Sequence, residues 1–360
     1  MTPWRPDAVC IERSELDTPI ARTVRERVPS SMIHLVDDAR AVTPGEFAAA
    51  KRVLMVQRHR GEFLRYCPAG TAAAVCCNYL VLSLANSCPF DCSYCFLQAY
   101  LANNPALRAF TNVDDALAEL DQVLRAHPGR MFRIGTGEWA DSLALDPVTG
   151  LSRFLVPFFA ERPNAVLELK TKTDSVDELV GLDPKGRVVV SWSVNAPEIV
   201  TAEEPGTASL ADRLVAARRV QDAGYRVGFH FDPLVEFDGW EDGYRAVIEA
   251  VFATVDPGRI AWISLGSLRL TPPLEGVIRS RRRSRYVLSG ELVPGVDGKA
   301  RVWRGLRIRM YRSLLQQLHA VDPRLPIYLC TEPASVWQRV MGEAPVDRQL
   351  GTRLLVRTTW

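Results

Sequence analysis

The sequence predicts an α/β protein built on a partial (β/α)6-type barrel, with an N-terminal extension and a basic hairpin insertion. Two observations support this fold class. Short apolar runs recur along the chain, each followed by a polar turn and then by apolar residues at helical spacing, which is typical of strands and helices alternating around a parallel sheet. At 360 residues and 47% hydrophobic composition, the chain is long enough to bury the core of one such catalytic domain.

Seven short apolar runs, bounded by turn residues, are predicted to be strands. They are 79–85, 131–135, 166–172, 188–194, 227–232, 260–265 and 326–330. Between them, apolar residues repeat every three or four positions in stretches that we predict to be helices. These are 114–127, 151–161, 211–223, 244–255 and 303–320. In a barrel of this kind the active site lies at the carboxyl ends of the strands.

The expected domain organisation is an extension over 1–75, the barrel over 76–335 and a C-terminal tail over 336–360. Within the barrel, 279–301 contain Pro294-Gly295 and Asp297-Gly298, turn dipeptides that predict an inserted hairpin or loop. No stretch reaches the roughly 18 apolar residues of a membrane span, and no basic segment leads into an apolar run at the start. We therefore expect a cytoplasmic protein without a membrane partner.

Three of the eight cysteines lie in one short segment at C-x3-C-x2-C spacing: Cys88, Cys92 and Cys95. Cysteine thiolates are the usual ligands of iron–sulfur clusters, and a fourth cysteine at ferredoxin spacing is missing. The spacing therefore predicts a [4Fe-4S] cluster with one iron free of protein ligands. The alternatives are a zinc site completed by a ligand from elsewhere and ordinary buried thiols.

Several later strands are also expected to end in ligand-binding groups. The second strand runs into Gly135-Thr136-Gly137-Glu138, where glycines let the backbone approach a ligand and a carboxylate can hold an ammonium group. No G-x-G-x-x-G motif leads into a helix, so a dinucleotide site has little support. Polar residues also close the third and fourth strands, and the candidates there are Lys172, Ser193 and Asn195.

The fifth predicted strand carries His230 and Asp232 on one face. If the barrel points both inward, they form a substrate-binding or proton-handling pair. The alternative is a buried histidine satisfied by a neighbouring aspartate.

Positive charge is concentrated late in the chain. Residues 279–312 hold ten arginines and one lysine against Glu291 and Asp297, although the whole chain carries only +2. This asymmetry favours a polyanionic partner such as DNA. The predicted phosphate contacts are Arg281, Arg282, Arg283 and Arg301. The alternative is a solvated basic hairpin and helix that pair with acidic loops.

The cysteine motif resembles that of the radical S-adenosylmethionine (radical SAM) superfamily. The resemblance implies that the free iron binds S-adenosylmethionine and that one electron from the reduced cluster cleaves this cofactor to a 5′-deoxyadenosyl radical, which abstracts hydrogen from a substrate. Tyr94, directly before the third cysteine, would pack on the cofactor as a catalytic aromatic. Gly135, Gly137 and Glu138 resemble the segment that binds the cofactor's amino group. An electron donor such as flavodoxin or ferredoxin is also implied.

A narrower resemblance, over roughly residues 15 to 340, is to spore photoproduct lyase and its relatives. Its most specific part is the block from Glu204 to Tyr244, and Cys95-Phe96-Leu97-Gln98 adds to it. The resemblance implies repair of a pyrimidine lesion in DNA by hydrogen abstraction from a thymine dimer. Lys172 and Ser193, with Asn195 nearby, would contact the cofactor, and the basic hairpin would approach the DNA.

Two departures from that family are visible. The lyases carry a cysteine at the end of the second strand that returns a hydrogen atom to the product radical, whereas 132–141 contain none and Thr136 stands near that place. Phe96 replaces the tyrosine that follows their last cluster cysteine. Cys330, at the end of the last strand, is the candidate substitute thiol, with a buried structural cysteine as the alternative.

These departures leave two further hypotheses open. One is a diverged radical enzyme acting on a small molecule or peptide. The other is a nucleic-acid-binding protein with a structural or redox-sensing cluster.

Overall fold

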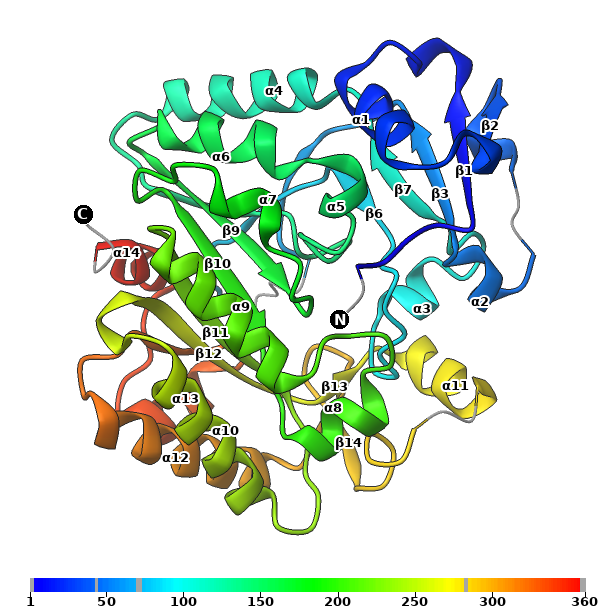
Figure 1. Cartoon of the computed structure of the whole chain (residues 1–360). Coiled ribbons are helices and arrows are strands. Elements are labelled where there is room, and N and C mark those ends of the chain that lie inside the picture. The colour runs from blue at the N-terminus through cyan, green and yellow to red at the C-terminus, as the bar shows by residue number, and fades with distance from the viewer. Residues whose placement is uncertain (1–2, 43–44, 69–72, 282–283, 357–360) are drawn as a thin grey trace.

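A curled, mostly parallel sheet with helices along its outer side forms the centre of the computed structural model (Figure 1), which describes residues 3–42, 45–68, 73–281 and 284–356. The strand order is β16-β12-β11-β10-β9-β8-β5-β4, and only β4 is antiparallel to its neighbour. The strands are β4 Leu64–Tyr66, β5 Leu80–Leu82, β8 Phe132–Gly135, β9 Ala165–Thr171, β10 Val188–Ser193, β11 Arg226–Leu234, β12 Ile260–Ser267 and β16 Ile327–Leu329. The predicted α/β fold and all seven predicted strands are therefore confirmed, with ends shifted by a few residues.

The helices that connect these strands bury one apolar face against the sheet. In the first, Ala116, Leu120 and Leu124 are buried at helical spacing, and Ser209 begins another by accepting a hydrogen bond from the Asp212 amide. They are α4 Val113–Ala126, α5 Asp146–Thr149, α6 Ser152–Ala160, α7 Asp177–Val180, α8 Pro197–Glu203, α9 Leu210–Asp222, α10 Trp240–Thr254 and α12 Arg304–Val321. All five predicted helices are present among them.

The N-terminal region forms a second sheet together with two strands that follow β5. Its order is β2-β1-β3-β7-β6, with β6 antiparallel to β7 and the other pairs parallel. Its elements are β1 Ala8–Glu12, α1 Pro19–Arg27, β2 Ile33–Val36, α2 Phe47–Ala50, β3 Val53–Gln57, β6 Ala85–Asn86, α3 Leu97–Tyr100 and β7 Leu107–Phe110, with short 3₁₀ turns at Arg13–Glu15, Ser30–Met32 and Ala39–Ala41. The segment between β6 and β7 contains the three clustered cysteines, so the second sheet anchors both ends of that segment.

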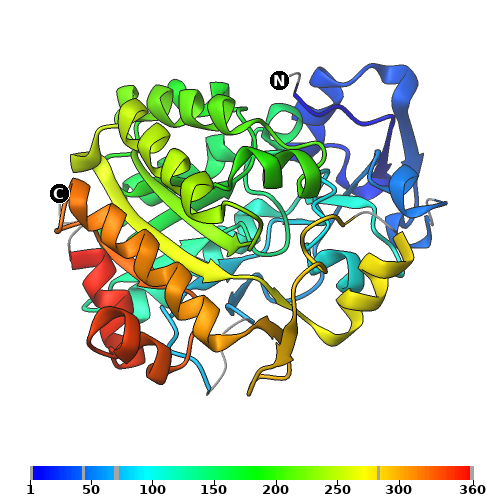
Figure 2. The same cartoon turned by 90° about the horizontal axis from the view of Figure 1, so that it is seen from below.

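The basic insertion predicted over 279–301 forms part of a larger unit, 269–302, which comprises one helix and a three-stranded antiparallel sheet and is called the basic insertion from here on. Its helix α11 packs on α3 beside the cysteine segment (Figure 2). The hairpin predicted from Asp297-Gly298 is formed by β14 and β15. The remaining elements of the structure are α11 Pro272–Arg281, β13 Arg269–Leu270, β14 Leu292–Pro294, β15 Ala300–Val302, α13 Ala334–Met341, α14 Asp347–Val356 and a 3₁₀ turn at Pro257–Arg259. Within the described ranges, no helix is long and apolar enough to cross a membrane.

Candidate active site

The three clustered cysteines lie together in one loop at the carboxyl end of β5, with β6 intervening. The loop is shaped by its own hydrogen bonds, because the Cys95 amide donates to the Cys92 carbonyl at 3.1 Å and the Ser87 hydroxyl donates to the Pro105 carbonyl at 2.7 Å. All three cysteines are free thiols, and they pack in one small apolar cluster with Phe90 and Ala144.

The chemistry of these thiols is compatible with an iron–sulfur cluster. Burial raises the pKa of the Cys88 thiol to about 12 and that of Cys92 further, although Lys51 and Lys172 oppose these shifts. Metal coordination would favour the thiolates that burial disfavours. In the part of the chain that the structure describes, no three His, Cys, Asp or Glu side chains are grouped closely enough to share one metal ion. Thiolates that each bind a different iron of a cluster need not meet at a single point.

Tyr94 is tied to a buried ion pair. Its hydroxyl donates to Glu204, which also accepts from Arg213 at 2.6 Å, and the Lys172 ammonium lies 5.7 Å from the centre of the Tyr94 ring. Burial would raise the pKa of Glu204, but Arg213 and Lys172 hold it below its usual value. Arg213 also donates to the Ser193 carbonyl at 2.8 Å. Glu204 and Arg213 were visible in the sequence only as part of the family block.

The Gly135-Thr136-Gly137-Glu138 segment lies beside the cysteine loop, because the ring of Trp139 is 5.9 Å from that of Phe96. A Cβ atom at Gly135 would lie 1.7 Å from the Tyr79 hydroxyl, so this glycine is required by packing inside the barrel. Glu138 is half-buried. Burial raises the pKa of its carboxyl, and the charges of Lys170 and Arg269 oppose that effect.

Asp141 joins this segment to the next strand. Its carboxylate accepts from the amides of Leu143 at 3.0 Å and Ala144 at 2.9 Å, and from the Lys172 amide at 2.8 Å. Asp141 therefore holds Lys172 at the barrel mouth, a role that no sequence motif indicated.

His230 is buried, and its contacts lie in the barrel interior. Its Nε2 is 2.8 Å from Glu168 Oε1, and its Nδ1 is 2.6 Å from the Ser264 hydroxyl. Burial and the charge of Lys170 lower the pKa of His230 to about 4. The buried histidine considered from the sequence therefore has a carboxylate partner, but that partner is Glu168 on β9 and not Asp232.

Asp232 instead forms a two-point ion pair with Arg269, at 2.9 and 3.1 Å. The same guanidinium lies 3.7 Å from the Cys330 sulfur. Burial raises the pKa of Cys330 to about 11, so its sulfur remains protonated near neutral pH. Cys330 lines a cavity of about 40 Å³ that Cys67, Cys76 and Cys77 also line.

Asn195 already uses its side-chain amide within the protein. The amide donates to the Pro233 carbonyl at 3.0 Å and accepts from the Tyr244 hydroxyl at 2.7 Å. Any contact between Asn195 and a cofactor would therefore compete with these bonds.

The arginines predicted to bind phosphate have carboxylate partners where the structure describes them. Arg281 pairs with Asp91, and Arg301 pairs with Asp297 while its side chain is 6% exposed. Arg282 and Arg283 lie outside the described residues.

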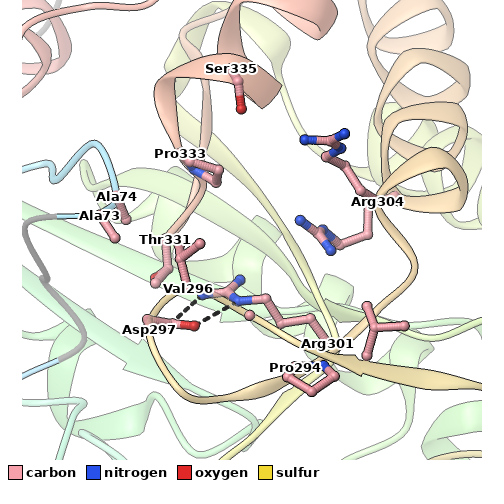
Figure 3. A pocket seen from close by; sticks show the side chains of 13 residues that line it. Ala73, Ala74, Pro294, Val296, Asp297, Arg301, Arg304, Thr331, Pro333 and Ser335 are labelled. Carbon is pink, nitrogen blue, oxygen red and sulfur yellow. Dashed lines mark hydrogen bonds and ion pairs between the residues drawn. The ribbon is translucent and has the colours of Figure 1, made fainter.

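Arg301 lines a cavity of about 290 Å³ between the hairpin and the starts of α12 and α13. Figure 3 shows Arg301 paired with Asp297 on one side of this cavity and Arg304 on another. Arg307 also lines the cavity and pairs with Glu332 at 3.0 Å. Arg304 has no carboxylate partner among the described residues.

Comparisons with known proteins agree with one another. The sequence model described as spore photoproduct lyase matches residues 4–283. A spore photoproduct lyase of Geobacillus sp. strain Y412MC61 is 27% identical over 293 residues, which cover 78% of this chain and 84% of the relative. That of Bacillus subtilis strain 168 is 29% identical over 199 residues, covering 55% of this chain and 58% of the relative. A solved structure of spore photoproduct lyase complexed with dinucleoside spore photoproduct has a TM-score of 0.81 at 24% identity, covering 91% of this chain and all of that one.

Proposed function

Because the chain belongs to the spore photoproduct lyase family, we propose that its substrate is a pyrimidine lesion in DNA, with spore photoproduct as the first candidate. Members of this family are radical SAM enzymes with a [4Fe-4S] cluster and S-adenosylmethionine as cofactors. Together these cofactors supply the 5′-deoxyadenosyl radical that takes a hydrogen atom from the substrate. The observation that supports the proposal most directly is the family match, which includes the partly buried loop with its three free thiols.

Different residues of this chain would bind the two cofactors. Cys88, Cys92 and Cys95 would hold the cluster, and the Glu138 carboxylate would accept hydrogen bonds from the amino group of S-adenosylmethionine. Tyr94 and Lys172, which lie next to each other, border the cofactor with Gly135, Gly137, Ser193 and Asn195. A small redox protein such as flavodoxin or ferredoxin delivers the electron. All eight cysteines are free thiols, which supports a reducing, cytoplasmic location.

Cys330 is proposed as the donor of a hydrogen atom to the product radical. Near neutral pH its sulfur is protonated, as this step requires. In the step the S–H bond breaks homolytically and a C–H bond forms on the product, so the unpaired electron passes to the Cys330 sulfur as a thiyl radical. Cys76 and Cys77 line the same small cavity and are the alternative donors.

The cavity of Figure 3 is proposed to receive a backbone phosphate of the DNA, next to the lesion. Arg304 supplies a guanidinium without a described carboxylate partner, and Arg301 lines the same space. His230 forms its hydrogen bonds inside the barrel, whereas Asp232, which is paired with Arg269, lies nearer the mouth. Because of this position we expect Asp232 to contact the substrate.

An anaerobic reaction with reconstituted enzyme, reductant and dinucleoside spore photoproduct tests the proposal. We expect conversion to thymidine by the wild type and loss of conversion in Cys330→Ala, with Cys10→Ala as the matched control from the second sheet. Retained conversion in Cys330→Ala together with loss in Cys76→Ala or Cys77→Ala would assign the donor role to Cys76 or Cys77. If the wild type forms 5′-deoxyadenosine but no thymidine, the lesion is not the substrate, and a small molecule or peptide takes its place.

A further inference from the structure

Asp91, between the first two cluster cysteines, is held by cations from two distant parts of the chain. Both of its carboxylate oxygens lie 2.8 Å from Arg281 Nη2, at the end of α11 in the basic insertion. The ammonium group of Lys51, which follows α2 in the N-terminal region, lies 3.6 Å from Asp91 Oδ1. The Arg281 and Asp91 side chains are each 17% exposed, so water screens this ion pair only partly.

The same arginine also reaches the loop beyond Cys92. Its Nη1 donates to the side-chain oxygen of Gln98, and the Gln98 amide donates to the carbonyls of Cys92 at 2.9 Å and Ser93 at 2.8 Å. One guanidinium therefore bonds to the side chain of Asp91, which precedes the second cluster cysteine, and through Gln98 reaches the carbonyls of that cysteine and of Ser93. A planar guanidinium can make such forked contacts, whereas an ammonium group cannot.

A buried carboxylate makes a second connection between the insertion and the loop. Glu203 is fully buried, and its Oε1 accepts from the amides of Arg285 at 2.7 Å and Tyr286 at 2.6 Å. Its Oε2 accepts from the hydroxyl of Ser93, whose amide in turn donates to the Glu203 carbonyl at 2.8 Å. Glu203 thus joins the backbone of the insertion to the residue that follows Cys92.

Apolar packing completes the contact. Tyr94 and Phe96 of the loop pack against a small cluster that includes Leu274 and Ile278 of α11. Between Cys88 and Cys95 the loop belongs to no helix or strand, so its shape depends strongly on contacts from outside.

From these contacts we propose that the basic insertion is a clamp on the cysteine loop, with Arg281 and Glu203 as positioning residues that hold the loop in its cluster-binding shape. Arg281 then acts on the cluster site and not on the DNA. The proposal uses the family assignment of the loop but does not depend on the identity of the substrate.

Hydrogen exchange of the cluster-free protein, followed by mass spectrometry over peptides covering 86–101, tests the clamp. In Arg281→Gln we expect exchange in this segment to be faster by about tenfold, the loss that follows removal of one charge-assisted hydrogen bond. Arg281→Lys should recover only part of the protection. The matched control is Arg279→Gln on the same helix, where a 63% exposed side chain pairs with Glu275, and its exchange should equal that of the wild type.

Two further measurements separate positioning from general damage. Each variant should keep the wild-type circular dichroism spectrum, and if Arg281→Gln does not, Arg281→Lys and Glu203→Gln provide the same comparison. After reconstitution, Arg281→Gln should retain less iron and show an altered electron paramagnetic resonance signal of the reduced cluster. Wild-type exchange in both Arg281→Gln and Glu203→Gln would overturn the proposal. If Arg281→Gln reduced the affinity for DNA while hydrogen exchange stayed unchanged, Arg281 would instead be a phosphate contact, as the sequence predicts.

Discussion

Replacing Glu168 by glutamine is expected to destabilise the protein strongly, because this carboxylate organises the barrel interior. It is 1% exposed and accepts four hydrogen bonds, each 2.8 Å long, whose donors are Arg133 Nη2, the Ser191 hydroxyl, His230 Nε2 and Trp262 Nε1. Burial alone would raise the pKa of Glu168, but Arg133 and His230 hold it well below the usual value. The carboxylate is therefore charged in the folded protein.

The expected loss of stability in Glu168→Gln is set by the positive charge of Arg133, which would be left buried without a partner. The Arg133 side chain is 2% exposed, and removing one partner of a buried ion pair typically costs about 3–5 kcal/mol. Glutamine keeps the volume and one acceptor oxygen, so little is added for packing, and we expect a loss of about 4 kcal/mol. Domains are stable by only about 5–15 kcal/mol, so the variant should be close to unfolding at moderate urea concentrations.

Urea unfolding followed by circular dichroism measures this loss. The double variant Glu168→Gln with Arg133→Met should recover about 2 kcal/mol relative to the sum of the single changes, because it removes the uncompensated charge. The control is Glu161→Gln, whose exposed pair with Lys185 should change stability by less than about 0.5 kcal/mol. A Glu168→Gln variant within about 1 kcal/mol of the wild type would refute the view that this carboxylate balances a buried arginine.

Three other outcomes are expected. The pKa of His230 is lowered to about 4 from an unfolded value near 6.5. At pH values between these two pKa values, the imidazole therefore binds a proton in the unfolded chain but not in the folded protein. Stability should therefore fall by up to about 3 kcal/mol as pH decreases through this window, and urea midpoints of His230→Gln should lack this slope. Arg304→Gln should weaken DNA binding and reduce by about one unit the slope of log binding constant against log salt concentration. The control Arg309→Gln changes an arginine that is paired with Glu241, and it should leave this slope unchanged. Equal slopes for Arg304→Gln and the wild type would show that Arg304 does not contact DNA phosphate. Glu138→Gln should weaken binding of S-adenosylmethionine by about tenfold in equilibrium dialysis without changing iron content, and wild-type affinity would exclude Glu138 as the partner of the amino group.

The barrel was predictable because its strands are mostly apolar and its helices keep a regular apolar spacing, which are local properties of the chain. The second sheet was not predicted, since it joins β3 of the N-terminal region to β7. Pairing between distant residues such as Leu54 and Leu107 produces no pattern in the local sequence of either strand. The cysteine loop was recognisable because all three thiols fall within eight residues. What supports that loop was hidden, since Arg281 lies 190 residues from Asp91.

His230 shows the same limit within the site. Alternation along one strand predicts that His230 and Asp232 share a face, but alternation says nothing about the neighbouring strands. The register places His230 opposite Ser193 on β10 and Ser264 on β12, and a carboxylate on β9 completes its contacts. The arginine-rich segment was likewise visible as composition, whereas its pairing with distant carboxylates depends on the tertiary fold.

The carboxylates in the interior and at the mouth of the barrel differ in whether they have partners within the protein. This difference indicates which carboxylate is available to a ligand. In the interior, the carboxylate of Glu168 already has four donors, so a ligand has little to add there. At the mouth, Asp232 is paired with Arg269, whereas the half-buried Glu138 has no hydrogen-bond partner within the described part of the chain. Burial raises the pKa of Glu138, and an ammonium group that paired with it would oppose this shift and favour the charged carboxylate. Since Trp139 packs on Phe96 directly after the last cluster cysteine, an ammonium group bound by Glu138 would lie beside the cluster loop, and this position suits the role proposed for Glu138 in holding S-adenosylmethionine.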